Sequence, residues 1–353
     1  MIVLKQIKYF LASNSCDGFI SYFDTCFDPK DGWKSYIIKG GPGTGKSSFM
    51  KKIAKRAEEE GYSVHRCPCS SDPDSLDAVV IPKLKVSVLD GTAPHVIDPK
   101  YPGAVENILN FGDFWNKEKL VARRNEIIKL TDKNKALHKT ASAFLKSAGT
   151  LLKENRSIVI KNIDTARAES YANALAKKFL KERGSAEGEK IRFLSAVSPK
   201  GIVNFEETVY NFCDKFVIIK DDTGVVSSLI FDNLRQKALA QKLKIITVKN
   251  PFLPNVTEHI LIPELGVAFL RESKYFGFKT DSRRIHAKRF MKSEETSKKA
   301  KINYKTAKML ISFAVETLKN AKSVHDELEE NFIGAMDYQK IDDFTERFCD
   351  SLF

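Results

Sequence analysis

The feature of this sequence that most constrains its fold is an internal repeat. At a constant shift of 181 residues, KSYIIKGGPGTGKSSFM (34–50) aligns with KFVIIKDDTGVVSSLIF (215–231). At a shift of 183, residues 10–25 align with residues 193–208. Because the matching segments keep their order along the chain, we expect two copies of one structural unit.

The repeat and the apolar patterns together predict the domain organisation. A chain of 353 residues is long for one hydrophobic core, so two domains are expected. The segments after each core have helical patterns, and residues 138–153 align with residues 304–319. The predicted parts are a first α/β core (1–112), a first helical extension long enough for a helical hairpin (113–183), a linker GSAEGE (184–189), a second core (190–280) and a second helical extension (281–353).

The first copy contains a complete phosphate-binding pattern. Gly40, Gly45, Lys46 and Ser47 satisfy G-x-x-x-x-G-K-[ST], between an apolar run at 36–38 and a segment with helical periodicity. Such a loop directs backbone N–H groups and a helix N-terminus at an anion. The predicted nucleotide-binding residues are Gly40, Gly41, Pro42, Gly43, Thr44, Gly45, Lys46, Ser47 and Ser48. Strands and helices that alternate around this loop predict an α/β fold with a mostly parallel sheet.

ATP and Mg²⁺ are the predicted ligands of this loop. Lys46 would stabilise charge on the β- and γ-phosphates, while Ser47 and Asp90 would hold the Mg²⁺. Asp90 ends the apolar run of KVSVLDGTAPH (85–95), although an Asp that simply closes a strand before a turn is the alternative. Gly91 follows where many ATPases have a water-polarising glutamate, so we expect slow turnover.

The second copy lacks the residues that this chemistry needs. Asp221 and Asp222 replace Gly40 and Gly41, Val226 replaces Gly45, Ser227 replaces Lys46, and Arg271 replaces Asp90. Two aspartates would repel a phosphate, and Val226 lacks the backbone freedom of glycine. We therefore expect one nucleotide site and one degenerate, structural copy.

Three segments carry a family resemblance: KGGPGTGKSS, CSSDPDSLDAVVIP (69–82) and LDGTAPHVIDPKYPGAV (89–105). On these residues the chain resembles a family of uncharacterised bacterial tandem P-loop proteins, identified as ATPases or nucleotide kinases. The resemblance covers nearly the whole chain and implies tandem P-loop NTPase cores. Members often keep a good loop in both halves, and this sequence departs from that pattern at 221–227.

Two cysteines and a histidine follow one another closely at 65–69. Cys67 and Cys69 could bind a metal or form a redox pair, but a pair of buried small residues is the favoured interpretation. His65 would point to the same side as Cys67 and add at most part of a site. The six cysteines do not suggest a disulfide framework.

Several polar residues near the predicted site have two interpretations each. Asp72, Asp74 and Asp77 could orient water, hold Mg²⁺ or contact an acceptor, or could cap a turn and a helix. His95 could sense the γ-phosphate or be a surface histidine. Arg123 and Arg124 could stabilise negative charge at the site, but a solvated helix face is the favoured interpretation.

The net charge of +13 is concentrated on the two extensions. Residues 116–190 contain 18 Lys/Arg and 9 Asp/Glu, and residues 281–310 contain ten and three. Such segments could bind nucleic acid, a protein partner or an anionic membrane surface, although a solvated face is favoured. No apolar run reaches the roughly 20 residues that span a bilayer, and no signal peptide is expected, so a cytoplasmic location is predicted.

Three functions remain open from the sequence. The first is a Mg-ATP-binding protein with slow ATPase activity, in which the γ-phosphate shifts the helical extensions. The second is a kinase that transfers the γ-phosphoryl group to a nucleotide or small molecule. The third is a non-catalytic, nucleotide-dependent scaffold or nucleic-acid-binding protein. The oligomeric state is left open.

Overall fold

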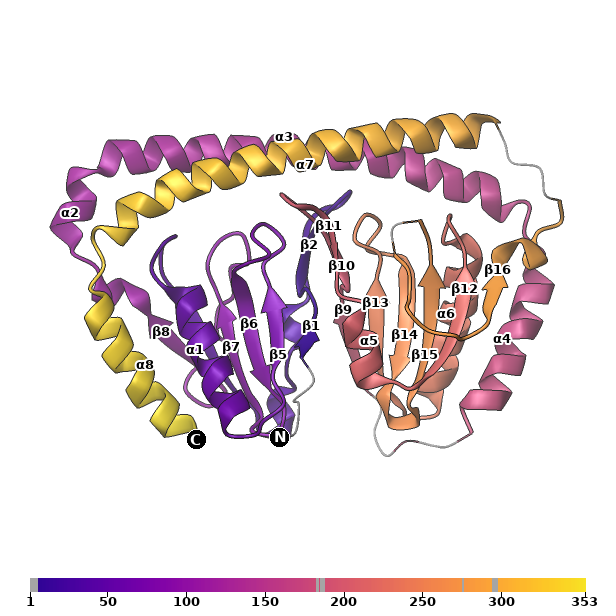
Figure 1. Ribbon diagram of the computed structural model, residues 1–353, viewed down its shortest axis with the longest axis horizontal. Helices are drawn as coiled ribbons and strands as arrows, with labels where there is room; N and C mark the ends of the chain where they lie inside the picture. The colour runs from indigo at the N-terminus through magenta and orange to yellow at the C-terminus, as the bar shows by residue number, and fades with distance from the viewer. Residues whose placement is uncertain (1–5, 182–183, 185–187, 275, 294–297) are drawn as a thin grey trace.

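Two six-stranded sheets form the body of the molecule, and two long helices cross above both of them (Figure 1). The computed structural model describes residues 6–181, 184, 188–274, 276–293 and 298–353. The expected α/β class, with mostly parallel sheets that are each followed by helices, is confirmed.

The first sheet has the strand order β1-β5-β6-β7-β4-β8. Its strands are β1 (Ile7–Lys8), β4 (Lys34–Lys39), β5 (His65–Pro68), β6 (Leu76–Ile81), β7 (Val86–Asp90) and β8 (Glu106–Asn110). Only β6 runs antiparallel to its neighbours. The parallel strands therefore end at one edge, where the loop that follows β4 lies.

The second sheet has the order β16-β12-β15-β14-β13-β9, which repeats the first sheet strand for strand. Its strands are β9 (Gly188–Arg192), β12 (Lys215–Lys220), β13 (Lys244–Lys249), β14 (Thr257–Ile262), β15 (Val267–Glu272) and β16 (Arg284–His286). Even the register is repeated, because Lys34 pairs with Val86 and Lys215 pairs with Val267. Each residue of the second pair lies 181 positions after its counterpart in the first pair, as in the sequence alignment.

The two halves meet around a local two-fold relation. Each half has a hairpin, β2 (Ala12–Ser15) with β3 (Gly18–Ser21) and β10 (Ser195–Ser198) with β11 (Gly201–Asn204). Phe10 and Phe193, which are 183 residues apart, exchange backbone hydrogen bonds of 2.8 and 3.0 Å with each other. Equivalent residues that pair with one another place a two-fold axis between them. Helix α5 (Glu207–Phe212) lies beside this junction and contacts β1.

One face of each sheet contributes to a shared core between the halves. Leu89 of β7 and Leu270 of β15 belong to the same buried cluster. The opposite faces are covered by α1 (Lys46–Glu59) in the first half and α6 (Val225–Ala240) in the second. Alternate residues of each strand are therefore buried on both sides, as expected for a sheet between two layers.

The helical extensions are exchanged between the two halves (Figure 1). The first comprises α2 (Lys117–Ala122), α3 (Arg124–Ile160) and α4 (Thr165–Phe179), and the second comprises α7 (Lys298–Ile333) and α8 (Tyr338–Leu352). Helix α3 packs antiparallel along α7, α4 packs on α6 of the second core, and α8 packs on α1 of the first core. The expected helical hairpin in the first extension is not formed.

The length of α3 explains this exchange. Its 37 residues span about 55 Å at 1.5 Å per residue, which takes the chain from the first core to the second (Figure 1). Small and branched apolar residues along its inner face, such as Ala141 and Leu145, pack against Ala314 and Leu318 of α7. The chain turns after Ile160, and Asp164 then caps α4.

Two predicted boundaries and one predicted alignment need correction. Of the predicted linker, residues 185–187 lie outside the described residues, while Gly188 and Glu189 begin β9. The second core extends past 280, because β16 pairs with β12. The alignment of 138–153 with 304–319 is wrong by seven residues: Asp164 and Asp337 cap α4 and α8 equivalently, which gives a shift of 173. Helices with a seven-residue apolar period still match each other when their alignment is shifted by seven residues, which explains the error.

Within the ranges that the structure describes, no helix is both long enough and apolar enough to cross a membrane.

Candidate functional site

The loop between β4 and α1 has the conformation that its glycines permit. Gly43 and Gly45 have φ values of +66° and +84°, in the left-handed region that favours glycine, and Gly45 is the N-cap of α1. The Thr44 hydroxyl donates to the carbonyl oxygen of Gly41 at 2.8 Å. The loop therefore leads from a buried strand directly into a helix N-terminus, as the sequence predicted.

The structure brings Lys46 and Asp90 together at this edge of the sheet. Strand β7 lies next to β4, with Asp90 opposite Ile38, and Lys46 Nζ lies 3.7 Å from Asp90 Oδ2. Lys46 Nζ also donates to the carbonyl oxygen of Gly41 at 2.7 Å. The Ser47 hydroxyl accepts a hydrogen bond from the Leu76 N–H at 3.0 Å. One ammonium, one hydroxyl and one carboxylate thus surround the start of α1, which is a donor set for a phosphate and a hard cation.

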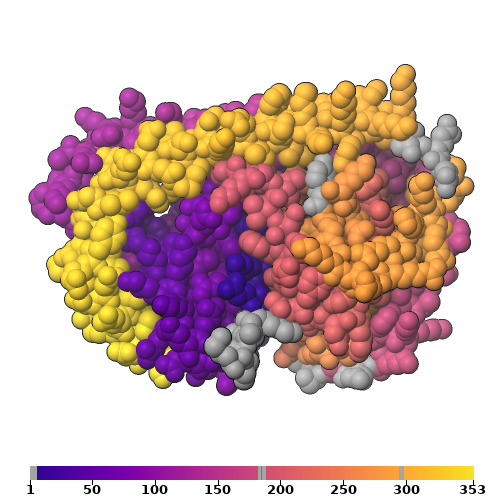
Figure 2. Space-filling model, viewed as in Figure 1, coloured from indigo at the N-terminus to yellow at the C-terminus, as the bar shows by residue number. Residues whose placement is uncertain are grey.

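Helices α7 and α8, from the other half of the sequence, border the first core (Figure 2), and both contact this loop. Glu329 Oε1 accepts a hydrogen bond of 3.2 Å from the Gly43 N–H, and the Tyr338 hydroxyl donates to the Gly43 carbonyl at 2.8 Å. A Cβ on Gly41 would come within 2.6 Å of the Phe332 ring, so the contact is tight. Sequence reasoning missed Glu329, Phe332 and Tyr338, because no local motif marks them.

Glu329 presents a negative charge to the loop. A hydrogen bond from His325 and, to a smaller degree, its charge hold the pKa of Glu329 below its ordinary value, although burial opposes this. The Gly43 N–H also contributes to the lower pKa. A backbone N–H of the β4–α1 loop is therefore bonded to a carboxylate that the chain itself supplies.

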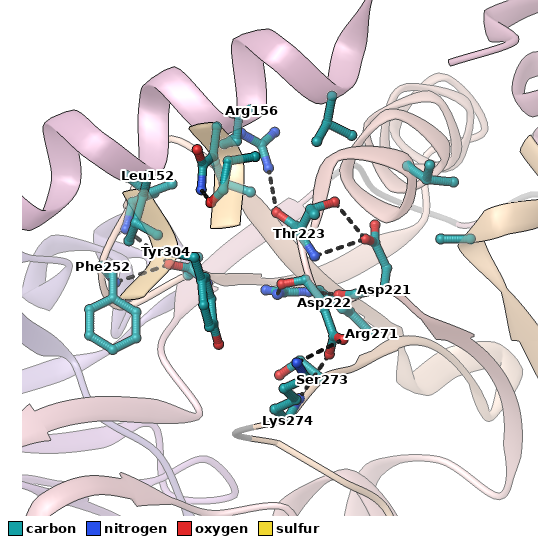
Figure 3. A pocket seen from close by; sticks show the side chains of 18 of the residues that line it. Leu152, Arg156, Asp221, Asp222, Thr223, Phe252, Arg271, Ser273, Lys274 and Tyr304 are labelled. Atoms are coloured by element: carbon teal, nitrogen blue, oxygen red, sulfur yellow. Dashed lines mark hydrogen bonds and ion pairs between the residues drawn. The ribbon is translucent and has the colours of Figure 1, made fainter. Parts of the chain in front are cut away.

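In the second copy, a carboxylate fills the corresponding loop completely (Figure 3). Asp221 accepts hydrogen bonds from the N–H groups of Thr223 (3.1 Å), Gly224 (2.9 Å) and Ser227 (2.9 Å). Arg271 donates to the carbonyl oxygens of Asp221 (2.7 Å) and Asp222 (2.9 Å). These bonds use the backbone donors that a phosphate would need, which supports the expectation of a degenerate site.

A cavity of 980 Å³ lies beside this second loop, between α3 and α7. Arg156 of α3 lines it and donates to the Gly224 carbonyl and the Ser228 hydroxyl, both at 2.9 Å. Arg156 and Glu329 are equivalent, since each lies eight residues before the Asp that caps the following helix. The exchanged arms therefore bring opposite charges to the two loops.

The other acidic candidates are held in a turn. Asp72 accepts from the Ser75 hydroxyl at 2.8 Å and pairs with Lys322 of α7 at 3.6 Å. Asp74 pairs with Lys200 of the β10–β11 hairpin at 2.5 Å. Both residues thus connect the first core to other parts of the chain.

Within the described residues, neither arginine candidate forms a hydrogen bond or ion pair with the β4–α1 loop. Arg123 donates to the Asn331 side chain at 3.4 Å, where α2 meets the end of α7, and Arg124 is exposed. Ser48, the last predicted loop residue, is exposed in the first turn of α1. The solvated-face interpretation of Arg124 agrees with its position.

The cysteine and histidine candidates separate into two groups. Cys67 is buried in the shared core, and His65 accepts or donates a hydrogen bond of 3.1 Å with the Tyr9 hydroxyl. Cys69, by contrast, lies beside Asp77 and His95, with ligand atoms of all three within 4.8 Å of one another. Burial would lower the pKa of His95, but the charges of Asp77 and Asp90 outweigh it and raise the pKa. Sequence reasoning did not predict that Cys69, Asp77 and His95 lie together.

Comparison with known proteins does not extend this description: no protein-family model, curated protein or solved structure matches the chain.

Proposed function

We propose that this protein binds Mg-ATP at residues 40–48, hydrolyses it slowly, and uses its nucleotide state to set the position of α7 and α8. The observation that carries the proposal is the hydrogen bond between the Glu329 carboxylate and the Gly43 N–H. A phosphate bound in a loop of this type needs that N–H group, so ATP and Glu329 compete for it. Binding of ATP therefore works against the contact that holds the end of α7.

In this proposal both cores are tandem P-loop units, and only the first binds nucleotide. Lys46 turns from the Gly41 carbonyl to the β- and γ-phosphates, and Ser47 and Asp90 hold Mg²⁺. The second core serves as a scaffold whose loop is neutralised internally by Asp221. Helices α7 and α8 belong to the second half of the sequence but pack on the first core. A nucleotide-dependent shift of these helices therefore reaches the second half.

Slow turnover follows from the residue after Asp90. Gly91 has no side chain that could polarise water, and its N–H donates to the Ile38 carbonyl at 3.0 Å. A protein that holds nucleotide for long periods suits a switch better than a rapid hydrolase. A cytoplasmic location, where ATP is abundant, is part of the same proposal.

The binding step can be tested by calorimetry and fluorescence together. Calorimetry should find one equivalent of Mg-ATP per chain, and Lys46→Ala should abolish binding. The Trp115 ring centroid lies 6.3 Å from that of Phe332, so a Trp33→Phe variant, whose only tryptophan is Trp115, reports movement at the end of α7. Two equivalents, no binding, or binding without any change in Trp115 emission would contradict the proposal.

The reaction can be separated from phosphoryl transfer by the dependence of product formation on acceptors. Phosphate release that is unchanged by added nucleosides, nucleotides or small alcohols supports an ATPase. ADP formation that requires one of these acceptors would instead indicate a kinase.

A further inference from the structure

The end of the sheet that carries the proposed nucleotide loop also contains a compact set of potential metal ligands: a thiol, a carboxylate and an imidazole. Cys69 follows β5, Asp77 lies in β6, and His95 follows β7, so three neighbouring strands position them. One potential ligand atom from each lies within 4.8 Å of the other two. Thiolate, carboxylate and imidazole are the groups that bind zinc in proteins.

Two buried polar atoms of this cluster lack hydrogen-bond partners among the described residues. Asp77 and His95 are 3% and 7% exposed, and neither Asp77 Oδ2 nor His95 Nδ1 has a hydrogen-bond partner among the described residues. A buried polar atom without a partner costs about 1–3 kcal/mol. A metal ion bound at Asp77 Oδ2 or at His95 Nδ1 would remove the cost for that atom, whereas protonation of His95 would still leave the N–H at Nδ1 without an acceptor there.

A direct contact and aromatic packing hold the two buried ligand groups side by side. His95 Nε2 lies 3.3 Å from Asp77 Oδ1. The His95 ring is held between Phe19 and Phe23, with ring centroids at 5.0 and 5.1 Å, so its orientation is fixed by packing.

The second half shows how the same buried acid is neutralised when no metal ligands are present. At a shift of 181, Asn250, Glu258 and Phe276 replace Cys69, Asp77 and His95. Glu258 accepts from Arg271 at 2.8 Å and from Asn250 at 3.1 Å, so a guanidinium supplies the positive charge. In the first half the position of Arg271 is Asp90, which adds a second negative charge instead.

We propose that Cys69, Asp77 and His95 bind one zinc ion beside the nucleotide loop, leaving its fourth coordination position for water or another oxygen ligand. The Cys69 thiol loses its proton to solvent on binding. The thiolate, the carboxylate and neutral imidazole then balance the charge of Zn²⁺. Cys69 is partly exposed, which provides a route for the ion from solvent. The proposal does not depend on ATP binding and concerns a site separate from the Mg²⁺ at Ser47 and Asp90.

Metal titrations of chelator-treated, full-length protein test this site without nucleotide. Zn²⁺ should bind with one equivalent in competition with a chromophoric chelator. Co²⁺ should give a thiolate-to-cobalt charge-transfer band in the near ultraviolet that excess Mg²⁺ does not remove. Cys69→Ser should abolish this band, and Cys69→Ser, Asp77→Asn and His95→Gln should each weaken Zn²⁺ binding at least about a hundredfold.

The matched control is Cys67→Ala, which removes a buried cysteine two residues away and should leave the stoichiometry and the band unchanged. Lys46→Ala should also leave metal binding unchanged, so loss of nucleotide binding and loss of metal binding can be distinguished. Circular dichroism of each variant checks that it is folded. Failure of the folded wild-type protein to bind Zn²⁺, or a band that persists in Cys69→Ser, would overturn the proposal.

Discussion

At the scale of residues, the sequence predicted the residues of the candidate site but not the α7 residue that contacts its loop. Lys46 and Asp90 could be identified from sequence because a loop motif and a strand end have fixed local spacing, and the structure places them 3.7 Å apart. Glu329 could not, because its contact with Gly43 joins residues that are 286 positions apart. Its proposed role as an anion that competes with nucleotide depends on the position of the end of α7.

Replacement of Glu329 by Gln should strengthen ATP binding. A neutral amide oxygen is a weaker acceptor than a carboxylate, and a difference of about 1.4 kcal/mol corresponds to roughly tenfold tighter binding. Calorimetry with Mg-ATP measures the change. Glu330→Gln, an exposed neighbour on α7, is the matched control and should leave the affinity unchanged. Equal affinities for wild type and Glu329→Gln would show that the contact does not oppose nucleotide.

His65 should make the folded state sensitive to acid. Burial, followed by the charges of Arg192 and Lys190, lowers the pKa of His65 from 6.5 to about 3. Between these values the unfolded chain binds a proton that the folded chain does not, so stability falls as the pH drops below about 6.5. At pH 4.5 the loss from this residue is roughly 2–3 kcal/mol.

Urea unfolding at pH 7 and pH 4.5 measures this effect. In His65→Asn the difference in unfolding free energy between the two pH values should be smaller than in wild type by that amount. The asparagine keeps a hydrogen-bonding group near the Tyr9 hydroxyl, which His65 Nδ1 contacts at 3.1 Å. An unchanged pH dependence would mean that His65 titrates normally in the folded protein.

At the scale of elements, an aspartate side chain holds the loop before α6 in its conformation. Asp221 is 3% exposed and bonds to three backbone N–H groups and to the Thr223 and Ser227 hydroxyls. From the sequence, the substitutions predicted that this loop does not bind phosphate. That the carboxylate fills the loop, rather than only repelling a ligand, required the structure.

Asp221→Ala should therefore destabilise the second core without creating a nucleotide site. Loss of a buried carboxylate that accepts three backbone hydrogen bonds should cost about 2–4 kcal/mol in the free energy of unfolding. Thermal or urea unfolding measures this loss, and calorimetry should still find one ATP. Asp222→Ala, at the partly exposed end of an ion pair with Lys274, should cost less than about 1 kcal/mol. A gain of a second ATP equivalent would refute the structural role.

At the scale of the whole molecule, the exchanged extensions hold the two halves together by buried helix contacts, in addition to the covalent linker. Ile341 and Phe348 of α8 are buried with α1, while Ala172 and Leu175 of α4 are buried with α6. Each half therefore lacks part of its own outer layer and takes it from the other. The shared core around Leu89 and Leu270 adds a second connection.

A chain cut between the halves should stay together. With a protease site inserted after residue 184, the cleaved fragments should co-elute in size-exclusion chromatography and separate only in denaturant. The buried helix contacts, rather than the peptide bond, provide the association free energy. An inserted site of equal length in the exposed turn at Lys30 is the control for the insertion itself. Fragments that separate in native buffer would contradict the exchanged packing.

The sequence by itself determined what depends on local spacing and repetition: the α/β class, the loop at 40–47, the equivalence of the two sheets and the loss of the motif in the second copy. These follow from backbone preferences and from apolar patterns read over a few residues. Tertiary structure alone decided which core each extension covers, which carboxylate meets Gly43, and that Cys69, Asp77 and His95 converge. A heptad pattern specifies an apolar face but not its partner, because any face of similar shape can bury it.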